Sequence, residues 1–244
     1  MKKLFPALAL LLLPTALPAQ TVSAADPRAA QAGADILKKG GTAADAVVAM
    51  MAALGVVEPG HSGLGGGGFM VYYDAKTGKM STYDAREAAP KAADMRWFFG
   101  SDGNPLSHSA AVPGGRSVGV PGEVRLMERA HTLHGKLPWA QLFQPAIRLA
   151  AGGWAITPRF YNFTSKTPKG FLQGWPVDYL YNPDGSAKPV GTVLKNPRQA
   201  ALLGRIATKG AGAFYTGVTA QALVKTVNTA PSDWWTPRTL PDSN

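Results

Sequence analysis

The 244-residue chain contains no cysteine, so disulfides and thiolate metal ligands are excluded and stability must come from a packed core. Charged residues make up only 16% of the chain and hydrophobic residues 45%, a balance that argues against disorder over most of its length. The formal net charge is +10, but no basic cluster interleaved with aromatic residues is present. We therefore predict no nucleic-acid partner, although a basic surface would still attract small anionic substrates.

An apolar run long enough to anchor the chain in a bilayer is also missing. Residues 1–24 combine Lys2 and Lys3, a short apolar stretch and several small residues, which is the layout of a secretory signal peptide. We predict cleavage after Ala19 or Ala24, and no membrane span after the signal is removed. Export together with the lack of cysteine predicts a periplasmic or secreted protein.

Several common catalytic and cofactor motifs are absent. No Gly-Lys-Ser/Thr follows the four glycines at 65–68, and a strand pattern stands where a dinucleotide-binding fold requires a helix. No Gly-x-Ser-x-Gly elbow supports a hydrolase built on His61 and Ser62. His131 and His134 lack a carboxylate between them, which favours a surface or helix-end role. We predict no metal site and no cofactor.

Apolar periodicity predicts several helices. Asp26 and Pro27 begin the first one, and Thr42-Ala-Ala-Asp45 resembles a capping box that begins a second, deeply buried helix. Further helical patterns start at Glu123, Pro138, Asn196 and Gly217. The helix that starts at Pro138 is expected to run without a break to Gly152-Gly153, and residues 155–195 are expected to form a loop-rich excursion.

Two strand-like runs, 69–74 and 79–84, are joined by a four-residue segment that ends in Gly78, which predicts a β-hairpin. The first run is the more apolar, so we expect it in the interior of a sheet. Residues 100–122 are rich in glycine, proline and serine and predict a long irregular connection.

The glycine run before this hairpin and Arg86 after it form the most informative feature. Four consecutive glycines leave backbone amides uncovered and permit positive φ, so the run either lets a ligand approach or makes a tight connection into a buried strand. Arg86 either pairs with Glu87 or Asp84 or offers its guanidinium to a ligand carboxylate. The residue types alone leave both questions open.

The order of the motifs resembles the N-terminal part of the γ-glutamyltransferases, also called glutathione hydrolases, over about residues 26 to 230. The motifs that carry this resemblance are Gly40–Ala49, Gly55–Pro59, the glycine run into Phe69 and Met70, Asp84–Pro90, Val120–Val124, Gly135–Trp139, Pro145–Ala150, Asn196-Pro197 and Ala213–Gly217.

The resemblance implies an α+β fold, the αββα sandwich of the N-terminal-nucleophile hydrolases, incomplete in this chain. Residues 25–230 would be the large-subunit portion of a precursor that cuts itself into a large and a small subunit. A new N-terminal Thr of the small subunit would attack the γ-glutamyl amide, with its own α-amino group as base. The implied partners are that small subunit and glutathione or other γ-glutamyl compounds, and Arg86 would bind the substrate α-carboxylate.

One departure from the family concerns catalysis. The sequence contains no Thr-Thr and no Thr-His, so the family's cleavage motif is absent and no residue of this chain is assigned a catalytic role. Residues 231–244 leave the family pattern, which we interpret as an aberrant or truncated tail. We expect the chain to be inactive alone, and two alternatives stay open: a catalytically inactive γ-glutamyl-binding module and a relative of the cephalosporin acylases.

Overall fold

The computed structural model describes residues 20–167, 172 and 174–229. Most of the predicted signal peptide and all of the 231–244 tail lie outside the described residues. No helix within the described ranges is long and apolar enough to cross a membrane. The elements, in chain order, are α1 Pro27–Lys38, α2 Ala43–Val57, β1 Gly68–Asp74, β2 Lys79–Ala85, α3 His108–Ala111, η1 Gly115–Ser117, α4 Glu123–His134, α5 Trp139–Leu142, α6 Gln144–Gly152, β3 Trp154–Ala155, α7 Pro158–Lys166, α8 Trp175–Leu180, β4 Val193–Leu194, α9 Pro197–Lys209, α10 Gly212–Tyr215 and α11 Gly217–Asn228.

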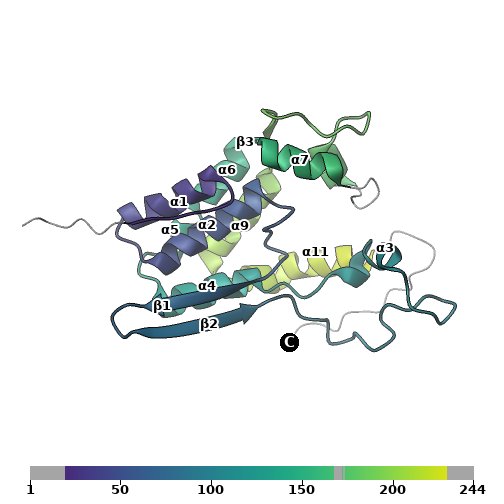
Figure 1. The fold of residues 1–244 in the computed structure, drawn as a ribbon, viewed down its shortest axis with the longest axis horizontal. Helices are drawn as coiled ribbons and strands as arrows, with labels where there is room; N and C mark the ends of the chain where they lie inside the picture. Colours follow the sequence, from purple (N-terminus) through teal and green to yellow (C-terminus); the bar gives the residue numbers. More distant parts are fainter. Residues whose placement is uncertain (1–19, 168–171, 173, 230–244) are drawn as a thin grey trace, which may run out of the picture.

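Helix α2 is the centre of the core and contacts α1, α4, α5 and α6 (Figure 1). Both predicted caps are confirmed: the Asp26 side chain caps α1, and Thr42 and Asp45 form a capping box at the start of α2. Because α2 is apolar on nearly every face, ten of its fifteen residues are buried. The predicted deep burial of this helix is therefore confirmed.

The helix predicted from Pro138 to Gly152 is wrong as a single element. The structure contains two helices, α5 and α6, that meet at the fully buried Phe143. Pro145 has no amide hydrogen, so it cannot continue the hydrogen-bond ladder of α5 and instead occupies the first turn of α6. The break lets α5 and α6 pack separately against α9.

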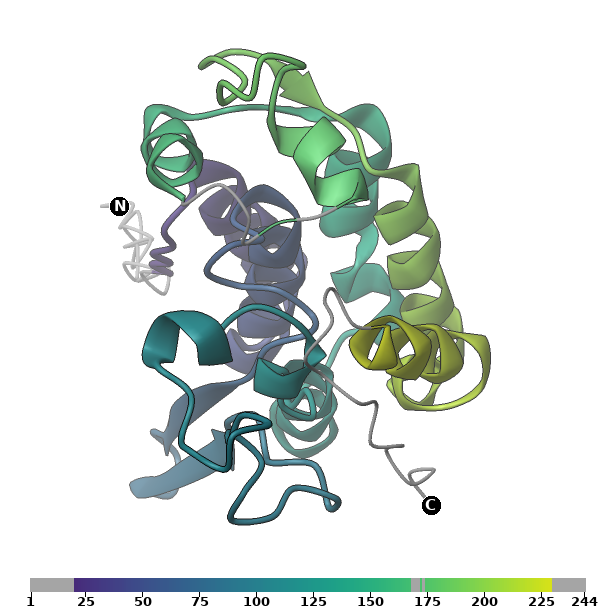
Figure 2. The same ribbon diagram turned by 90° about the vertical axis from the view of Figure 1, so that its right-hand side faces the viewer.

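The loop-rich interpretation of residues 155–195 is also wrong in part. This stretch contains α7 and α8, and a short antiparallel sheet pairs Trp154 with Leu194 at its base. Thr157 caps α7, and Phe160 anchors the helix because its ring is fully buried against the buried Trp154. Figure 2 shows this segment at the opposite end of the molecule from the β1–β2 hairpin.

The predicted hairpin is confirmed as an antiparallel β1–β2 pair, with Gly78 at positive φ in its turn. One face packs on α4, where the Tyr72 ring stacks on His134 at 3.7 Å between centroids. On the other face, Phe69, Val71 and Tyr73 are 67%, 65% and 60% exposed. Within the described residues β1 pairs only with β2, so its predicted place inside a larger sheet is not formed here.

Residues 100–122 are mostly irregular, as predicted. The short elements α3 and η1 interrupt the connection, and an isolated bridge pairs Val120 with Ala88. This bridge brings the end of the connection back beside the segment that follows β2.

Candidate functional site

The glycine run and the Arg86 segment meet at one end of the hairpin. The glycines lead into β1 and Arg86 directly follows β2, and the antiparallel register places Gly68 opposite Ala85. The start of α4 closes the same junction, because the amides of Gly122 and Glu123 donate to the Gly66 carbonyl oxygen at 2.9 and 3.0 Å. Three segments that are far apart in the sequence therefore form one site.

Close packing, and not backbone conformation, explains the glycines of this junction. None of the glycines at 65–68 adopts positive φ, so the conformational freedom that the run permits is not used. A β-carbon on Gly67 would overlap the Ala85 carbonyl oxygen, and a β-carbon on Gly122 would overlap the same atom. Only glycine lets the backbones approach this closely at these two positions.

Arg86 is exposed at the edge of the junction. Its side chain is 71% exposed, and its Nε donates to Glu87 Oε2 at 3.2 Å. Its backbone amide donates to Asp84 Oδ1 at 2.9 Å, which fixes the start of the Arg86 side chain. Among the described residues no hydrogen bond is made by the two terminal nitrogens of the guanidinium. Arg86 is thus paired with Glu87 at Nε, and the outer edge of its guanidinium is open.

Glu123 is a second acidic residue of the junction, and the sequence analysis missed it as a site residue. Glu123 is the first residue of α4, and its side chain is buried. Its backbone amide donates to the carbonyl oxygen of Gly66, which lies on the glycine run. Burial, and after it the negative charge of Glu87, raises the pKa of Glu123 to about 8. In the sequence, Glu123 belongs to the Val120–Val124 motif and begins a predicted helix, and neither fact assigns it to a site.

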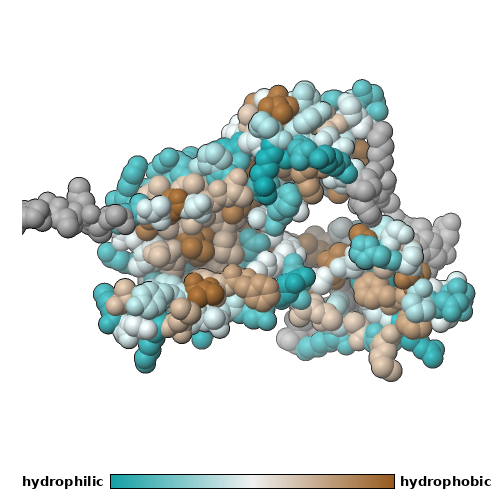
Figure 3. Space-filling model, viewed as in Figure 1, coloured by the Kyte–Doolittle hydropathy of each residue, from teal (hydrophilic) through white to brown (hydrophobic). Residues whose placement is uncertain are grey.

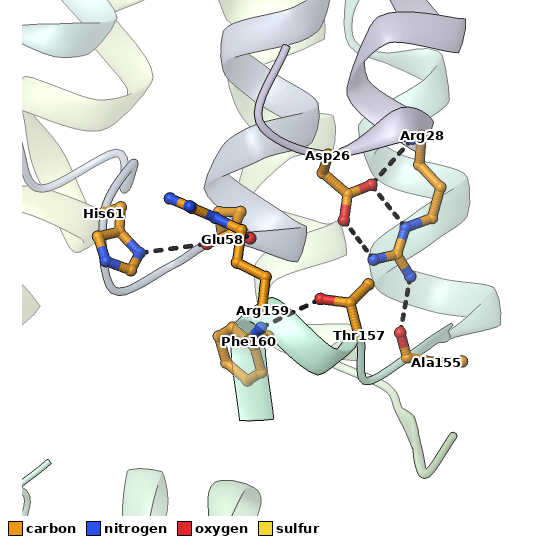
Figure 4. A network of polar contacts seen from close by, with 8 residues as sticks. All are labelled: Asp26, Arg28, Glu58, His61, Ala155, Thr157, Arg159 and Phe160. Atoms are coloured by element: carbon orange, nitrogen blue, oxygen red, sulfur yellow. Dashed lines mark hydrogen bonds and ion pairs between the residues drawn. The ribbon is translucent and has the colours of Figure 1, made fainter. Parts of the chain in front are cut away.

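A separate polar network ties the end of α2 to α7 (Figure 4). Glu58 is 1% exposed, and its two carboxylate oxygens accept from Arg159 Nε at 3.2 Å and contact His61 Nδ1 at 3.1 Å. Nearby, the Arg28 guanidinium bonds to the Asp26 carboxylate and to the Ala155 carbonyl oxygen. His61 therefore helps hold the fold together, and the sequence did not predict its partner.

Two of the remaining histidines, His131 and His134, also have structural contacts. His131 Nε2 lies 2.8 Å from the Leu137 carbonyl oxygen, and His134 Nε2 lies 2.7 Å from the Tyr83 hydroxyl. Both positions agree with the predicted surface or helix-end roles at the end of α4. Over residues 20–167, 172 and 174–229, no group of three His, Asp or Glu side chains is arranged to hold a metal ion.

The chain was compared with known proteins and protein families, and it matches one family. The family model for gamma-glutamyltranspeptidase matches residues 29–235. Glutathione hydrolase 3 of Arabidopsis thaliana is 37% identical over 86% of this chain and 32% of its own length. The glutathione hydrolase proenzyme of Bacillus subtilis is 38% identical over 84% of this chain and 35% of its own length. The chain thus spans about a third of these curated relatives.

The structural comparison agrees. Gamma-glutamyltranspeptidase from Pseudomonas nitroreducens, solved in complex with L-DON, has a TM-score of 0.78 and 38% sequence identity, and the match covers 86% of this chain and 61% of that one. This likeness confirms the predicted α+β class, with the described residues forming part of an N-terminal-nucleophile hydrolase fold. From the motif order, the family model and the shared fold, the chain belongs to the γ-glutamyltranspeptidase family.

Proposed function

We propose that this chain is the large-subunit portion of a periplasmic or secreted γ-glutamyltransferase, and that Arg86 binds the α-carboxylate of a γ-glutamyl donor such as glutathione. The observation that supports this role is the state of the Arg86 side chain. Glu87 holds Nε, while the outer edge of the guanidinium faces solvent with no partner among the described residues. That edge presents two parallel N–H donors, the geometry that a carboxylate accepts in a bidentate pair.

Transfer of the γ-glutamyl group requires more than this site. In the proposed reaction a Thr at the N-terminus of the small subunit attacks the γ-amide carbon, and the amine of the donor leaves with a proton. Water or the amine of an acceptor then releases the glutamyl group from the Thr oxygen. The proposal places this Thr in the small subunit, as the resemblance to the family implies. Arg86 contributes orientation: it holds the α-carboxylate end of the glutamyl group while the carbonyl carbon of the γ-amide reacts.

Calorimetry with glutathione tests the assignment of Arg86. We expect Arg86→Ala to lower the affinity by about tenfold or more, since a charge-assisted bidentate pair is lost. Arg86→Lys should restore little of this loss, because an ammonium cannot present two parallel donors. The control is Arg148→Ala, which removes an exposed arginine on α6, away from the hairpin. Equal affinities of the native protein and Arg86→Ala would refute the role of Arg86.

Two alternatives can be separated with a complementing small subunit. A γ-glutamyltransferase releases product from a γ-glutamyl anilide, whereas a relative of the cephalosporin acylases prefers the corresponding glutaryl substrate. A catalytically inactive binding module binds glutathione but releases no product from either substrate, even when the small subunit is present.

A further inference from the structure

The carboxyl groups of Glu87 and Glu123 both lie beside Gly66, on the side where a side chain would stand. A β-carbon built on Gly66 would lie 3.3 Å from Glu87 Oε1 and 3.8 Å from Glu123 Oε2. Glu87 is confined on another side by Gly119, where a β-carbon would come within 2.7 Å of the Glu87 Cβ. The two acids therefore lie on the same side of Gly66, with Glu123 buried and the Glu87 side chain 32% exposed.

The two carboxylate oxygens of Glu87 lie in different surroundings. Oε2 accepts from Arg86 Nε, whereas Oε1 faces Gly66, beside the buried Glu123 carboxyl group. The side chains therefore form a continuous series from the exposed arginine to the buried acid. A negative charge on Glu123 would repel the Glu87 carboxylate that orients Arg86, whereas a neutral Glu123 leaves that carboxylate in place.

The other charged and titratable groups around Glu123 do not compensate its charge. Arg125 on the same helix is already paired with Glu128, its Nη1 lying 2.7 Å from Glu128 Oε2, and its guanidinium packs over the Tyr215 ring. Tyr215 lies on α10, and its hydroxyl donates to the Pro121 carbonyl oxygen. Arg86, on the segment after β2, reaches Glu87 and not Glu123. Glu123 therefore has no cationic partner in the described part of the chain.

We propose that Glu123 is a positioning residue for Arg86: in its neutral form it lets Glu87 hold the guanidinium in the orientation that binds a carboxylate, and its ionisation releases that hold. This inference rests on the proposed function only for the identity of the ligand. The coupling from Glu123 through Glu87 to Arg86 is a property of the junction itself.

The coupling is testable without ligand, by following the Arg86 ¹⁵Nε resonance of the full chain from pH 6 to pH 9.5. We expect one step near pH 8 in the native protein, because burial beside Glu87 raises the pKa of Glu123 to about 8. Glu123→Gln, which mimics the neutral acid, should remove the step, and so should Glu87→Gln. The matched control Glu128→Gln, an exposed acid on the same helix, should keep it. A flat native profile, or an unchanged step in Glu123→Gln, would overturn the proposal.

Glutathione affinity gives the second readout. Between pH 7 and pH 9 we expect an approximately tenfold loss of affinity in the native protein and no loss in Glu123→Gln, because one charge-assisted hydrogen bond no longer orients Arg86. A pH dependence shared equally by both proteins overturns the positioning role. If glutathione binds to neither protein at any pH, the proposed function fails, and the Arg86 resonance alone decides the coupling.

Discussion

Gly67 illustrates how a single carbonyl group determines a residue type. A β-carbon there would overlap the Ala85 oxygen and would also lie 2.9 Å from the Glu87 amide nitrogen. A β-carbon on Gly65, two residues earlier, would meet no atom within 4 Å, and Gly65 has no positive φ. Adjacent glycines in one run are therefore under different constraints, which the sequence does not distinguish.

We predict that Gly67→Ala destabilises the protein by about 1–3 kcal/mol, the usual cost of forcing an extra methyl group into a packed site. Gly65→Ala is the matched control and should change the free energy of unfolding by less than about 0.5 kcal/mol. Urea denaturation of both variants, followed by tryptophan fluorescence, measures the difference. Similar midpoints for the two variants would contradict the packing explanation.

Asp45 shows how far a local pattern predicts structure. The sequence predicted its role in the capping box, and its Oδ2 does accept from the Thr42 amide at 2.9 Å. The same carboxylate also accepts from the amides of Lys136 and Leu137, about ninety residues later. A capping pattern reports only the next turn of the helix, so the second set of bonds could not be inferred from it.

Prediction of site residues was limited in the same way, because a local pattern does not reveal contacts between distant segments. Arg86 stood out because an arginine directly after an apolar hairpin is unusual, and it lies at the junction. Glu123 did not stand out, because its character comes from burial beside Glu87, which depends on how three distant segments meet. A raised pKa of this kind is a property of packing and has no sequence pattern.

At the scale of elements, α7 depends on a contact that its own sequence does not reveal. Apolar periodicity is weak between 155 and 195, which is why a loop was expected there. The helix forms because Thr157 caps it, Phe160 is buried in the core, and Glu58 at the end of α2 pairs with Arg159. Tertiary contacts thus supply the stability that local propensity lacks.

We predict that Arg159→Ala loosens α7. Among the described residues, Glu58 would keep only His61 as a side-chain partner while staying buried. The variant should therefore lose about 1–2 kcal/mol of stability, a value reduced because Arg159 is half exposed. Amide hydrogen exchange should accelerate in α7 and stay unchanged in α1. Lys166→Ala, an exposed cation on the same helix, is the control. Equal exchange rates for α7 in both variants would show that the ion pair does not hold the helix.

For the whole molecule, the exposed face of the β1–β2 hairpin carries large apolar side chains that no other part of the described chain covers. Phe69, Val71 and Tyr73 lie on it together with Met80, which is opposite Tyr73 and 67% exposed. Figure 3 shows apolar surface over this hairpin. Contiguous apolar surface of this kind marks a face that another sheet or chain covers.

We predict that Val71→Lys reduces self-association of the chain, because the charge interrupts the apolar face at its centre. Static light scattering at increasing protein concentration measures the effect. Val218→Lys is the matched control, since Val218 on α11 is 71% exposed but lies outside the hairpin. The same decrease in both variants would mean that added charge alone, and not this face, controls solubility.

The junction at the Ala85 carbonyl oxygen has a further consequence, for the order of folding. The α1–α2 pair is built from neighbouring segments, so it can form as soon as both helices exist. The junction instead needs Gly67, Ala85 and Gly122 to come together, which requires closing two loops. During synthesis, the α1–α2 pair can therefore form before the junction beside Arg86, which is complete only after α4 has docked.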